Sequence, residues 1–158
     1  MYGVVYMINH EVFMKEALLE GRKALEKGEI PVGAVVVQNG KIVGRGHNLR
    51  ESQNDPTAHA EIVALRDAGD KLGTWHLKGS LLYVTLEPCP MCAGALLQAR
   101  IEKVIYGADD PKAGCAGSLL NILQFPGFNH FVKITSGVLV EESIALLQEF
   151  FREKRRKT

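Results

Sequence analysis

The chain has few cysteines, almost no net charge and no long apolar run. Its three cysteines cannot all pair, and two of them, Cys89 and Cys92, are closely spaced. A secreted disulfide framework is therefore disfavoured, and a reducing, cytoplasmic compartment is expected. A formal net charge of +1 provides no overall attraction to nucleic acid. The apolar stretch 1–8 lacks a basic flank and is too short to cross a bilayer, so we expect no targeting signal and no membrane partner.

What is present is the composition of an ordinary globular protein, with 46% hydrophobic and 23% charged residues among 158. That length fits one domain with its own hydrophobic core. We expect residues 1–10 to form an N-terminal extension and residues 11–158 a single domain. Basic residues crowd the segment 152–157, where they either complement a helix dipole or contact phosphates.

Hydrophobic periodicity and turn residues predict an alternation of helices and strands. Helices are expected over 11–27, 58–68, 90–100 and 141–157, and a short helical turn over 118–123. Strands are expected over 32–38, 41–45, 81–86, 103–106 and 132–134, and a loop over 107–117. Asn39 and Gly40 are the preferred pair for a type I′ turn and predict a β-hairpin. The strand–helix–strand order over 81–106 predicts parallel pairing with a right-handed crossover.

Three side chains are candidate ligands of one metal ion. Catalytic zinc takes three nitrogen or sulfur ligands and keeps a fourth position open for water. The Cys-x-x-Cys spacing lets Cys89 and Cys92 hold the same ion, while His59 reaches it from another helix. Both sets lie at expected helix starts, where free N–H groups and the helix dipole favour thiolates. The sequence therefore predicts a zinc site formed by His59, Cys89 and Cys92.

Glu61 follows His59 by two positions and is the candidate catalytic residue. A carboxylate beside a zinc-activated water can accept its proton and return it to a substrate. It need not be a metal ligand for that role. The combined pattern, His-x-Glu followed by Pro-Cys-x-x-Cys, resembles the signature of zinc-dependent nucleobase deaminases, which indicates a hydrolytic site.

Each half of this pattern has another interpretation when it is taken alone. A Cys-x-x-Cys motif also occurs in redox pairs and in structural zinc sites, which close with a fourth cysteine or histidine. The remaining candidates for that fourth ligand show no paired spacing: Cys115, His10, His47, His76 and His130. A redox pair would leave His59 and Glu61 without a role, so both alternatives are disfavoured.

Further motifs surround the metal pattern over nearly the whole chain, from about residue 13 to 151. They are Glu-Ile-Pro-Val-Gly-Ala at 29–34, His-Asn at 47–48, Asp-Pro-Thr-Ala-His-Ala-Glu-Ile at 55–62, the segment 83–95, Asp-Pro-Lys-Ala-Gly at 110–114, Gly-Ser-Leu at 117–119, Asn-His at 129–130 and Phe-Phe at 150–151. With these motifs the sequence resembles the bacterial tRNA adenosine deaminases, which convert the wobble adenosine of an arginine tRNA to inosine. Relatives acting on cytosine, guanine or pterin-like rings share the earlier motifs, whereas those from residue 110 onward distinguish the tRNA enzymes.

The resemblance implies an α/β fold of the cytidine deaminase type, a three-layer α/β/α sandwich around a mixed five-stranded sheet. It also implies one zinc ion per subunit, no organic cofactor, and a homodimer that acts on the anticodon stem-loop of tRNA-Arg. Rival functions are the deamination of a free base or nucleoside, such as guanine or cytidine, and non-catalytic RNA binding by a zinc-stabilised protein. The basic tail and the later motifs favour the tRNA substrate.

The same resemblance implies roles for four residues on the substrate side. Asn48 would hydrogen-bond the purine, Asp110 would lie near the target ribose, and Asn129 and Phe151 would hold the splayed anticodon loop. Judged by residue type alone, Asn48 and Asp110 are equally typical of turns, and a phenylalanine in this helix is typical of a core. Cys115 stands among the later motifs without a predicted role.

Overall fold

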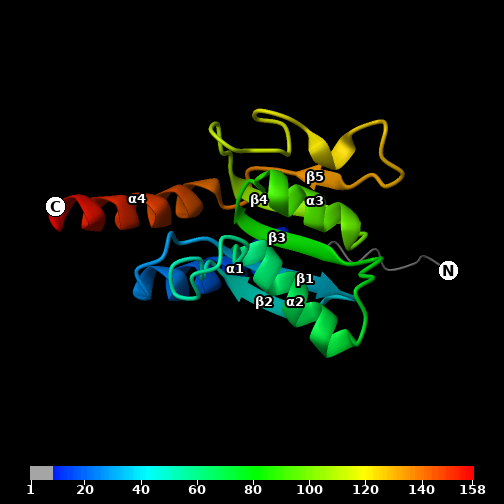
Figure 1. Ribbon diagram of the computed structural model, residues 1–158, viewed down its shortest axis with the longest axis horizontal. Helices are drawn as coiled ribbons and strands as arrows, with labels where there is room; N and C mark the ends of the chain where they lie inside the picture. Colours follow the sequence, from blue (N-terminus) through cyan, green and yellow to red (C-terminus); the bar gives the residue numbers. More distant parts are fainter. Residues whose placement is uncertain (1–8) are drawn as a thin grey trace.

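The computed structural model describes residues 9–158 as a mixed five-stranded sheet with helices on both faces (Figure 1). The elements in chain order are α1 (His10–Glu26), β1 (Gly33–Gln38), β2 (Lys41–His47), α2 (Ala60–Leu72), β3 (Leu81–Leu86), α3 (Pro90–Gln98), β4 (Lys103–Ala108), the 3₁₀ helix η1 (Ile122–Gln124), β5 (Lys133–Thr135) and α4 (Val140–Arg156). Residues 1–8 of the expected extension lie outside the described part. Asn9 is the N-cap of α1, and its side chain accepts a hydrogen bond from the N–H of Glu11.

The strand order in the sheet is β2-β1-β3-β4-β5. β1 is antiparallel to both of its neighbours, whereas β3, β4 and β5 are mutually parallel. The predicted hairpin and the predicted parallel pair are therefore confirmed. Asn39 and Gly40 have φ values of 52° and 73°, as a type I′ turn requires at its two central residues.

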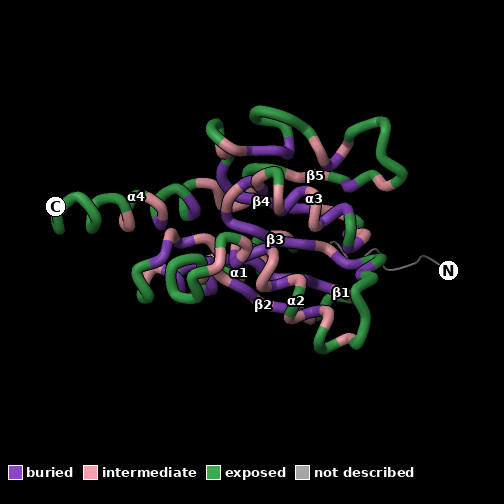
Figure 2. Tube along the Cα trace, in the orientation of Figure 1, coloured by how far each residue is buried: buried purple, intermediate pink, exposed green. Residues whose placement is uncertain are grey.

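Hydrophobic side chains alternate between the two faces of the sheet and bury a core on each. On β1, Ala34 and Val36 pack with α2 and α3, while Val35 and Val37 pack with α1 on the opposite face. Figure 1 shows α2 and α3 in front of the sheet and α1 behind it, and Figure 2 shows the buried strands between them. The predicted three-layer α/β/α sandwich is confirmed.

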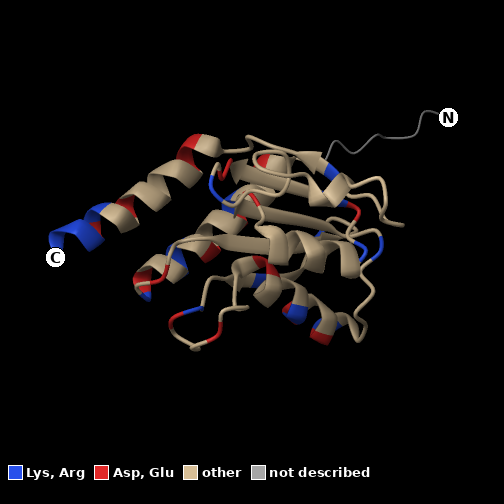
Figure 3. Cartoon of the chain, turned by 45° about the horizontal axis from the view of Figure 1, so that its top comes forward, with Lys and Arg blue, Asp and Glu red and all other residues tan. Residues whose placement is uncertain are grey.

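The last helix, α4, packs against the body through its first half and projects from it with its second half (Figure 1). Leu146 is its buried hydrophobic anchor, and Glu149 pairs with Arg22 of α1 at 3.2 Å. The projecting end is predominantly basic (Figure 3). Within residues 9–158, no helix combines the length and the apolar character needed to cross a membrane.

The helix expected over 90–100 ends at Gln98, and the strands expected over 41–45 and 103–106 each continue for two more residues, so the loop expected over 107–117 begins only after Ala108. Two other predicted segments differ more. The helix expected over 58–68 begins at Ala60 and continues through Gly69 to Leu72, because the left-handed residue that ends it is Gly73, with φ 69°. The helical turn expected over 118–123 is wrong for most of its length, since η1 begins only at Ile122. Ser118 instead donates two hydrogen bonds to Glu87, which draws that segment away from helical geometry.

Two glycines of β2 let α2 lie directly on the sheet. A Cβ atom on Gly44 would lie 2.5 Å from the carbonyl oxygen of Ala64, and one on Gly46 would lie 2.6 Å from that of Ala60. Only glycine permits such a close approach between a helix and a strand. The contact fixes the start of α2, and therefore the position of His59, relative to the sheet.

Candidate metal centre and catalytic cavity

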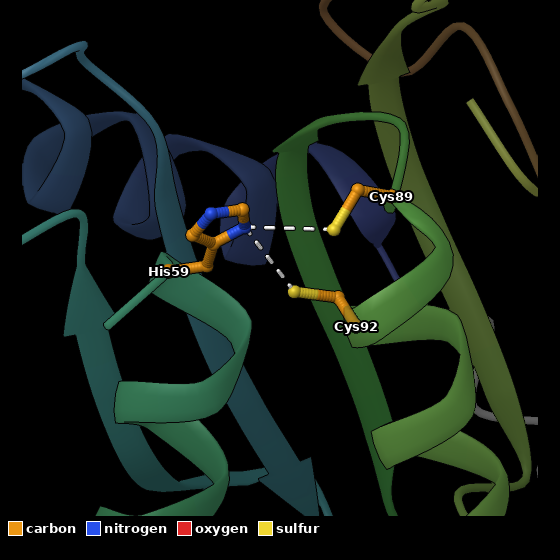
Figure 4. A group of neighbouring side chains, drawn as sticks. All are labelled: His59, Cys89 and Cys92. Carbon is orange, nitrogen blue, oxygen red and sulfur yellow. Dashed lines mark hydrogen bonds between the residues drawn. The ribbon is translucent and has the colours of Figure 1, made fainter. Parts of the chain in front are cut away.

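The three predicted metal ligands meet where two helices begin. His59 is the N-cap of α2, Cys89 is the N-cap of α3, and Cys92 lies in the first turn of α3. Pro90 opens α3, where its missing N–H removes no helical hydrogen bond. The side chains of His59 and Cys89 do not cap their own helices. Figure 4 shows the imidazole pointing toward both sulfur atoms.

The distances among these atoms fit a tetrahedral zinc site. Nδ1 of His59 lies 3.5 Å from Sγ of Cys89 and 3.6 Å from Sγ of Cys92, and the three ligand atoms all lie within 4.8 Å of one another. Tetrahedral zinc with Zn–S bonds of about 2.3 Å and Zn–N bonds of about 2.0 Å separates such atoms by about 3.6 Å. The donor set and its spacing therefore suit zinc, with a fourth position left for another ligand.

The two thiols of the cluster differ in protonation. Hydrogen bonds from Cys92 and His59 lower the pKa of Cys89 to about 4, so this sulfur is a thiolate at neutral pH. The pKa of Cys92 is raised because it hydrogen-bonds that thiolate and is buried. The hydrogen bond with Cys89 also raises the pKa of His59. One thiolate beside a second sulfur and an imidazole nitrogen is a donor set that suits a zinc ion.

Glu61 lines the cavity beside the three ligands and is itself buried. Burial, reinforced by the Cys89 thiolate, raises the pKa of Glu61 to about 7. A carboxyl group that titrates near neutral pH is suited both to accept and to return a proton. The cavity has a volume of about 160 Å³, and its walls also include Asn48, Asp110 and Ala113.

Asn48 and Asp110 lie at this cavity and also stabilise turns. The side chain of Asn48 donates to the carbonyl oxygen of Ile30 at 3.2 Å and accepts from the N–H of Arg50 at 3.1 Å. The carboxylate of Asp110 accepts from two N–H groups of the following turn, one of them from Ala113 at 3.2 Å. The two interpretations of these residues, turn and cavity wall, are therefore compatible.

Asn129 and Phe151 do not line the metal cavity. Asn129 precedes β5 and borders a separate depression of about 140 Å³ on the far side of α3. Phe151 is 45% exposed on α4, with its ring edge-on to Phe150 at a centroid distance of 5.2 Å. Phe150 itself borders a groove of about 370 Å³ that shares Arg50 with the wall of the metal cavity.

Two buried carboxylates beside the site have roles that the sequence did not reveal. Glu87 is 2% exposed and accepts hydrogen bonds from the loop that carries Asp110. Glu29 is 1% exposed and accepts hydrogen bonds from the N–H groups of Glu51 and Ser52 in the other loop at the cavity. The available signal was an acidic residue directly beside a buried apolar segment, which needs several donors to remain ionised.

This fold, with two helix N-termini joined by a His/Cys/Cys group, defines a deaminase of the cytidine deaminase-like class. The family model of the MafB19-like deaminases matches residues 8–155. Two curated relatives, both called tRNA-specific adenosine deaminase, come from Bacillus subtilis and Aquifex aeolicus. The first is 56% identical over 96% of this chain and 94% of its own, and the second is 51% identical over 92% and 95%. The chain belongs to the family of the bacterial tRNA-specific adenosine deaminases, and the resemblance stated above is confirmed.

Solved structures extend this comparison. A structure from a study of A-to-I editing by tRNA deaminases at the wobble position of transfer RNA matches with a TM-score of 0.83 and 44% identity, covering 85% of this chain and 98% of that one. A guanine deaminase from Bacillus subtilis matches with a TM-score of 0.63 and 44% identity, covering 70% and 71%. The fold is thus shared by enzymes with different substrates, so the fold alone does not identify the substrate.

Proposed function

We propose that this protein converts adenosine to inosine at the wobble position of the tRNA-Arg anticodon by zinc-dependent hydrolytic deamination. The observation that carries the proposal is the 56% identity to a tRNA-specific adenosine deaminase over 96% of the chain. The candidate metal cluster of His59, Cys89 and Cys92 supports it. Glu61 lines one cavity together with His59 and Cys89, so the groups that hydrolysis needs lie side by side.

The reaction divides between the metal and Glu61. His59, Cys89 and Cys92 would hold the zinc ion, which would supply a Lewis acid able to lower the pKa of water from its bulk value to about 7. Glu61 would accept one proton from water as its oxygen bonds to C6 of the purine and pass that proton to N1. It would then accept the remaining proton from the new C6 hydroxyl and pass it to the leaving amine as the C6–N bond breaks. The products are inosine and ammonia, so no organic cofactor is needed.

The walls of the cavity suit a single flipped base. Its volume of about 160 Å³ is below the roughly 300–1,000 Å³ of typical ligand pockets, which favours one ring system over a whole nucleotide. The Asn48 amide has two N–H groups and two oxygen lone pairs. One N–H group donates to the backbone and one lone pair accepts from it, so one N–H group and one lone pair remain available to the purine. We assign Asp110, on the neighbouring wall, to the ribose side.

RNA beyond the target base would contact the surface next to the cavity. The groove at Phe150 is lined by both charges, with four glutamates beside Arg50, Lys154 and Lys157, and the predominantly basic end of α4 projects beyond it (Figure 3). Exposed aromatic rings beside cations are a common platform for splayed nucleotides. We assign Phe151 and Asn129 to the anticodon loop, which must then extend past the cavity in two directions.

The assembly and its setting complete the proposal. We expect a cytoplasmic homodimer, each subunit holding one zinc ion in a single domain of residues 11–158. Sedimentation equilibrium tests the dimer, and metal analysis against protein concentration tests the stoichiometry. A ratio of one zinc ion per dimer would contradict the proposal.

One assay separates the candidate functions. The zinc-loaded protein is incubated with an arginine tRNA that has adenosine at the wobble position, with the same tRNA carrying guanosine there, and separately with free adenosine, cytidine and guanine. We expect inosine and ammonia only from the first substrate. Turnover of free bases alone would support a base deaminase like the matched guanine deaminase. RNA binding without any turnover would support the non-catalytic alternative.

A further inference from the structure

Glu87 joins the metal-binding segment to the loop on the substrate side of the cavity. It lies between the end of β3 and Cys89, so its backbone belongs to the segment that carries two of the metal ligands. Its side chain points to the other segment, the loop 109–121, which contributes Asp110 and Ala113 to the cavity wall. The residue thus contacts both halves of the site.

The carboxylate of Glu87 accepts four hydrogen bonds from that loop. The backbone N–H groups of Asp110 and Ala116 donate at 3.0 Å each, that of Ser118 donates at 3.1 Å, and the Ser118 hydroxyl donates a fourth bond. The donors come from both ends of the loop. A single side chain therefore connects both ends of the loop, whereas the carboxylate of Asp110 binds only the turn that directly follows it.

The loop 109–121 also packs so closely against the Glu87 carboxylate that no further atom fits between them. A Cβ atom on Gly114 would lie 2.5 Å from Oε1 of Glu87 and 2.5 Å from the carbonyl oxygen of Asp110. Cys115 adds a backbone hydrogen bond at 2.8 Å to the carbonyl oxygen of Pro88, directly beside the metal ligand Cys89. The position of the loop relative to the metal segment is therefore determined by Glu87 and the space beside it.

The structure assigns Glu87 the role of a positioning residue. Its carboxylate holds the loop 109–121 at a fixed distance from the metal ligands, and the substrate fits into the space between the loop and these ligands. Glu87 also lines the cavity, but in this role it acts through the loop and not on the metal or the reacting atoms. The inference rests on the proposed function, because it treats the cavity as the place where the base binds. It predicts that loss of the Glu87 carboxylate impairs substrate binding while the metal site stays intact.

Glu87→Gln tests this role with little change in volume. Glutamine has one acceptor oxygen for four donors and adds an N–H₂ group facing N–H groups, so the loop must shift. With an anticodon stem-loop RNA as substrate, we expect KM to rise by about tenfold to 100-fold and kcat to change by less than about threefold. Zinc content should remain at the wild-type level. If the substitution merely reduced the fraction of folded, active protein, the apparent kcat would fall and KM would stay unchanged.

Hydrogen exchange measures the loop without relying on catalysis. In the Glu87→Gln protein, the amides of Asp110, Ala116 and Ser118 should exchange at least about tenfold faster, because their shared acceptor is weakened. Gly114→Ala serves as a second variant. Its added Cβ atom would displace the loop while the Glu87 side chain stays unchanged. We expect the same rise in KM from it.

Asp67→Asn is the matched control. Asp67 is a partly buried carboxylate on α2 that accepts from the N–H of Arg45 and from Lys71, away from the cavity, so its change should leave KM and kcat as they are. Unchanged KM in both the Glu87 and the Gly114 variants, or unchanged amide exchange in the loop, would overturn the positioning role. Failure of the wild-type protein to act on RNA would instead overturn the proposed function, and the exchange result would still report on the loop.

Discussion

Single glutamates of this protein show how the environment divides one residue type between different tasks. Glu29 and Glu87 are buried, and although burial opposes their ionisation, hydrogen bonds from loop N–H groups and serine hydroxyls lower their pKa below the usual value. Glu61 is also buried, but burial dominates and raises its pKa to about 7. The first two are therefore permanent acceptors that organise loops, and the third is the group that can exchange a proton.

Glu61→Gln should separate proton transfer from metal binding. We expect turnover to fall by at least about 100-fold, because general acid–base catalysis by one side chain contributes that much or more. Zinc content should remain at the wild-type level, since the three ligand atoms come from other residues. Glu102→Gln, at an exposed position, is the matched control and should retain full activity. Loss of zinc from the Glu61 variant would show that Glu61 is a ligand.

At the level of elements, the site depends on how closely α2 and α3 approach the sheet. His59 and Cys89 are both N-caps, so each ligand moves with the end of its helix. The position of α2 is determined by Gly44 and Gly46 of β2, which leave no room for a side chain beneath the helix. The packing of a helix on a strand is thereby coupled to the geometry of the metal site.

Gly46→Ala tests this coupling. A Cβ atom there would lie 2.6 Å from the carbonyl oxygen of Ala60, and relieving that overlap should cost about 1–3 kcal/mol of unfolding free energy. We also expect weaker zinc binding, because the start of α2 carries His59. Urea unfolding and zinc titration measure the two effects.

Gly94→Ala is the matched control for that change. Nothing lies within 4 Å of a Cβ atom at Gly94, which is inside α3, so alanine should be neutral or slightly stabilising there. Equal stability of the Gly46 and Gly94 variants would mean that α2 does not depend on the close approach.

At the level of the whole molecule, two hydrophobic cores on opposite faces of one sheet provide most of the stability, and loops held by carboxylates shape the site. The first core supports α2 and α3 and therefore the candidate metal ligands. The second attaches α1, and α4 adds its contacts on the same side. Because Glu29 and Glu87 need to be ionised to hold their loops, the stability of the molecule depends on pH.

The contribution of Glu29 to the free energy of unfolding should be lost at acidic pH. Its pKa is lowered in the folded protein, so its stabilising effect is complete above the unfolded-state pKa of about 4.3 and is lost as the pH falls through the folded-state value. We therefore expect Glu29→Gln to be less stable than the wild type at pH 7, with the difference shrinking below about pH 4. Urea unfolding at pH 7, 5, 4 and 3 measures the difference. A gap that stayed constant over this range would contradict the assignment.

Several elements of the fold follow from local sequence alone. β3 is observed with its predicted bounds, Leu81–Leu86, because a short apolar run between turn residues is typical of a buried strand. The hairpin at Asn39 and Gly40 follows from the rare backbone conformation that these two residues tolerate. The end of α2 was predicted too early, since Gly69 is compatible with a helix interior and only the conformation of Gly73 ends it.

The sequence by itself identified the candidate ligands and the candidate proton carrier, because metal preference and acid–base chemistry are properties of residue types at short spacings. Only the tertiary structure decided that His59 lies 3.5 Å from Cys89, since that distance depends on α2 resting on β2. It also decided that Asp110 lines the cavity while Asn129 and Phe151 lie outside it. The shape of the 109–121 loop was beyond prediction because one buried carboxylate, Glu87, determines it through contacts distant in the sequence.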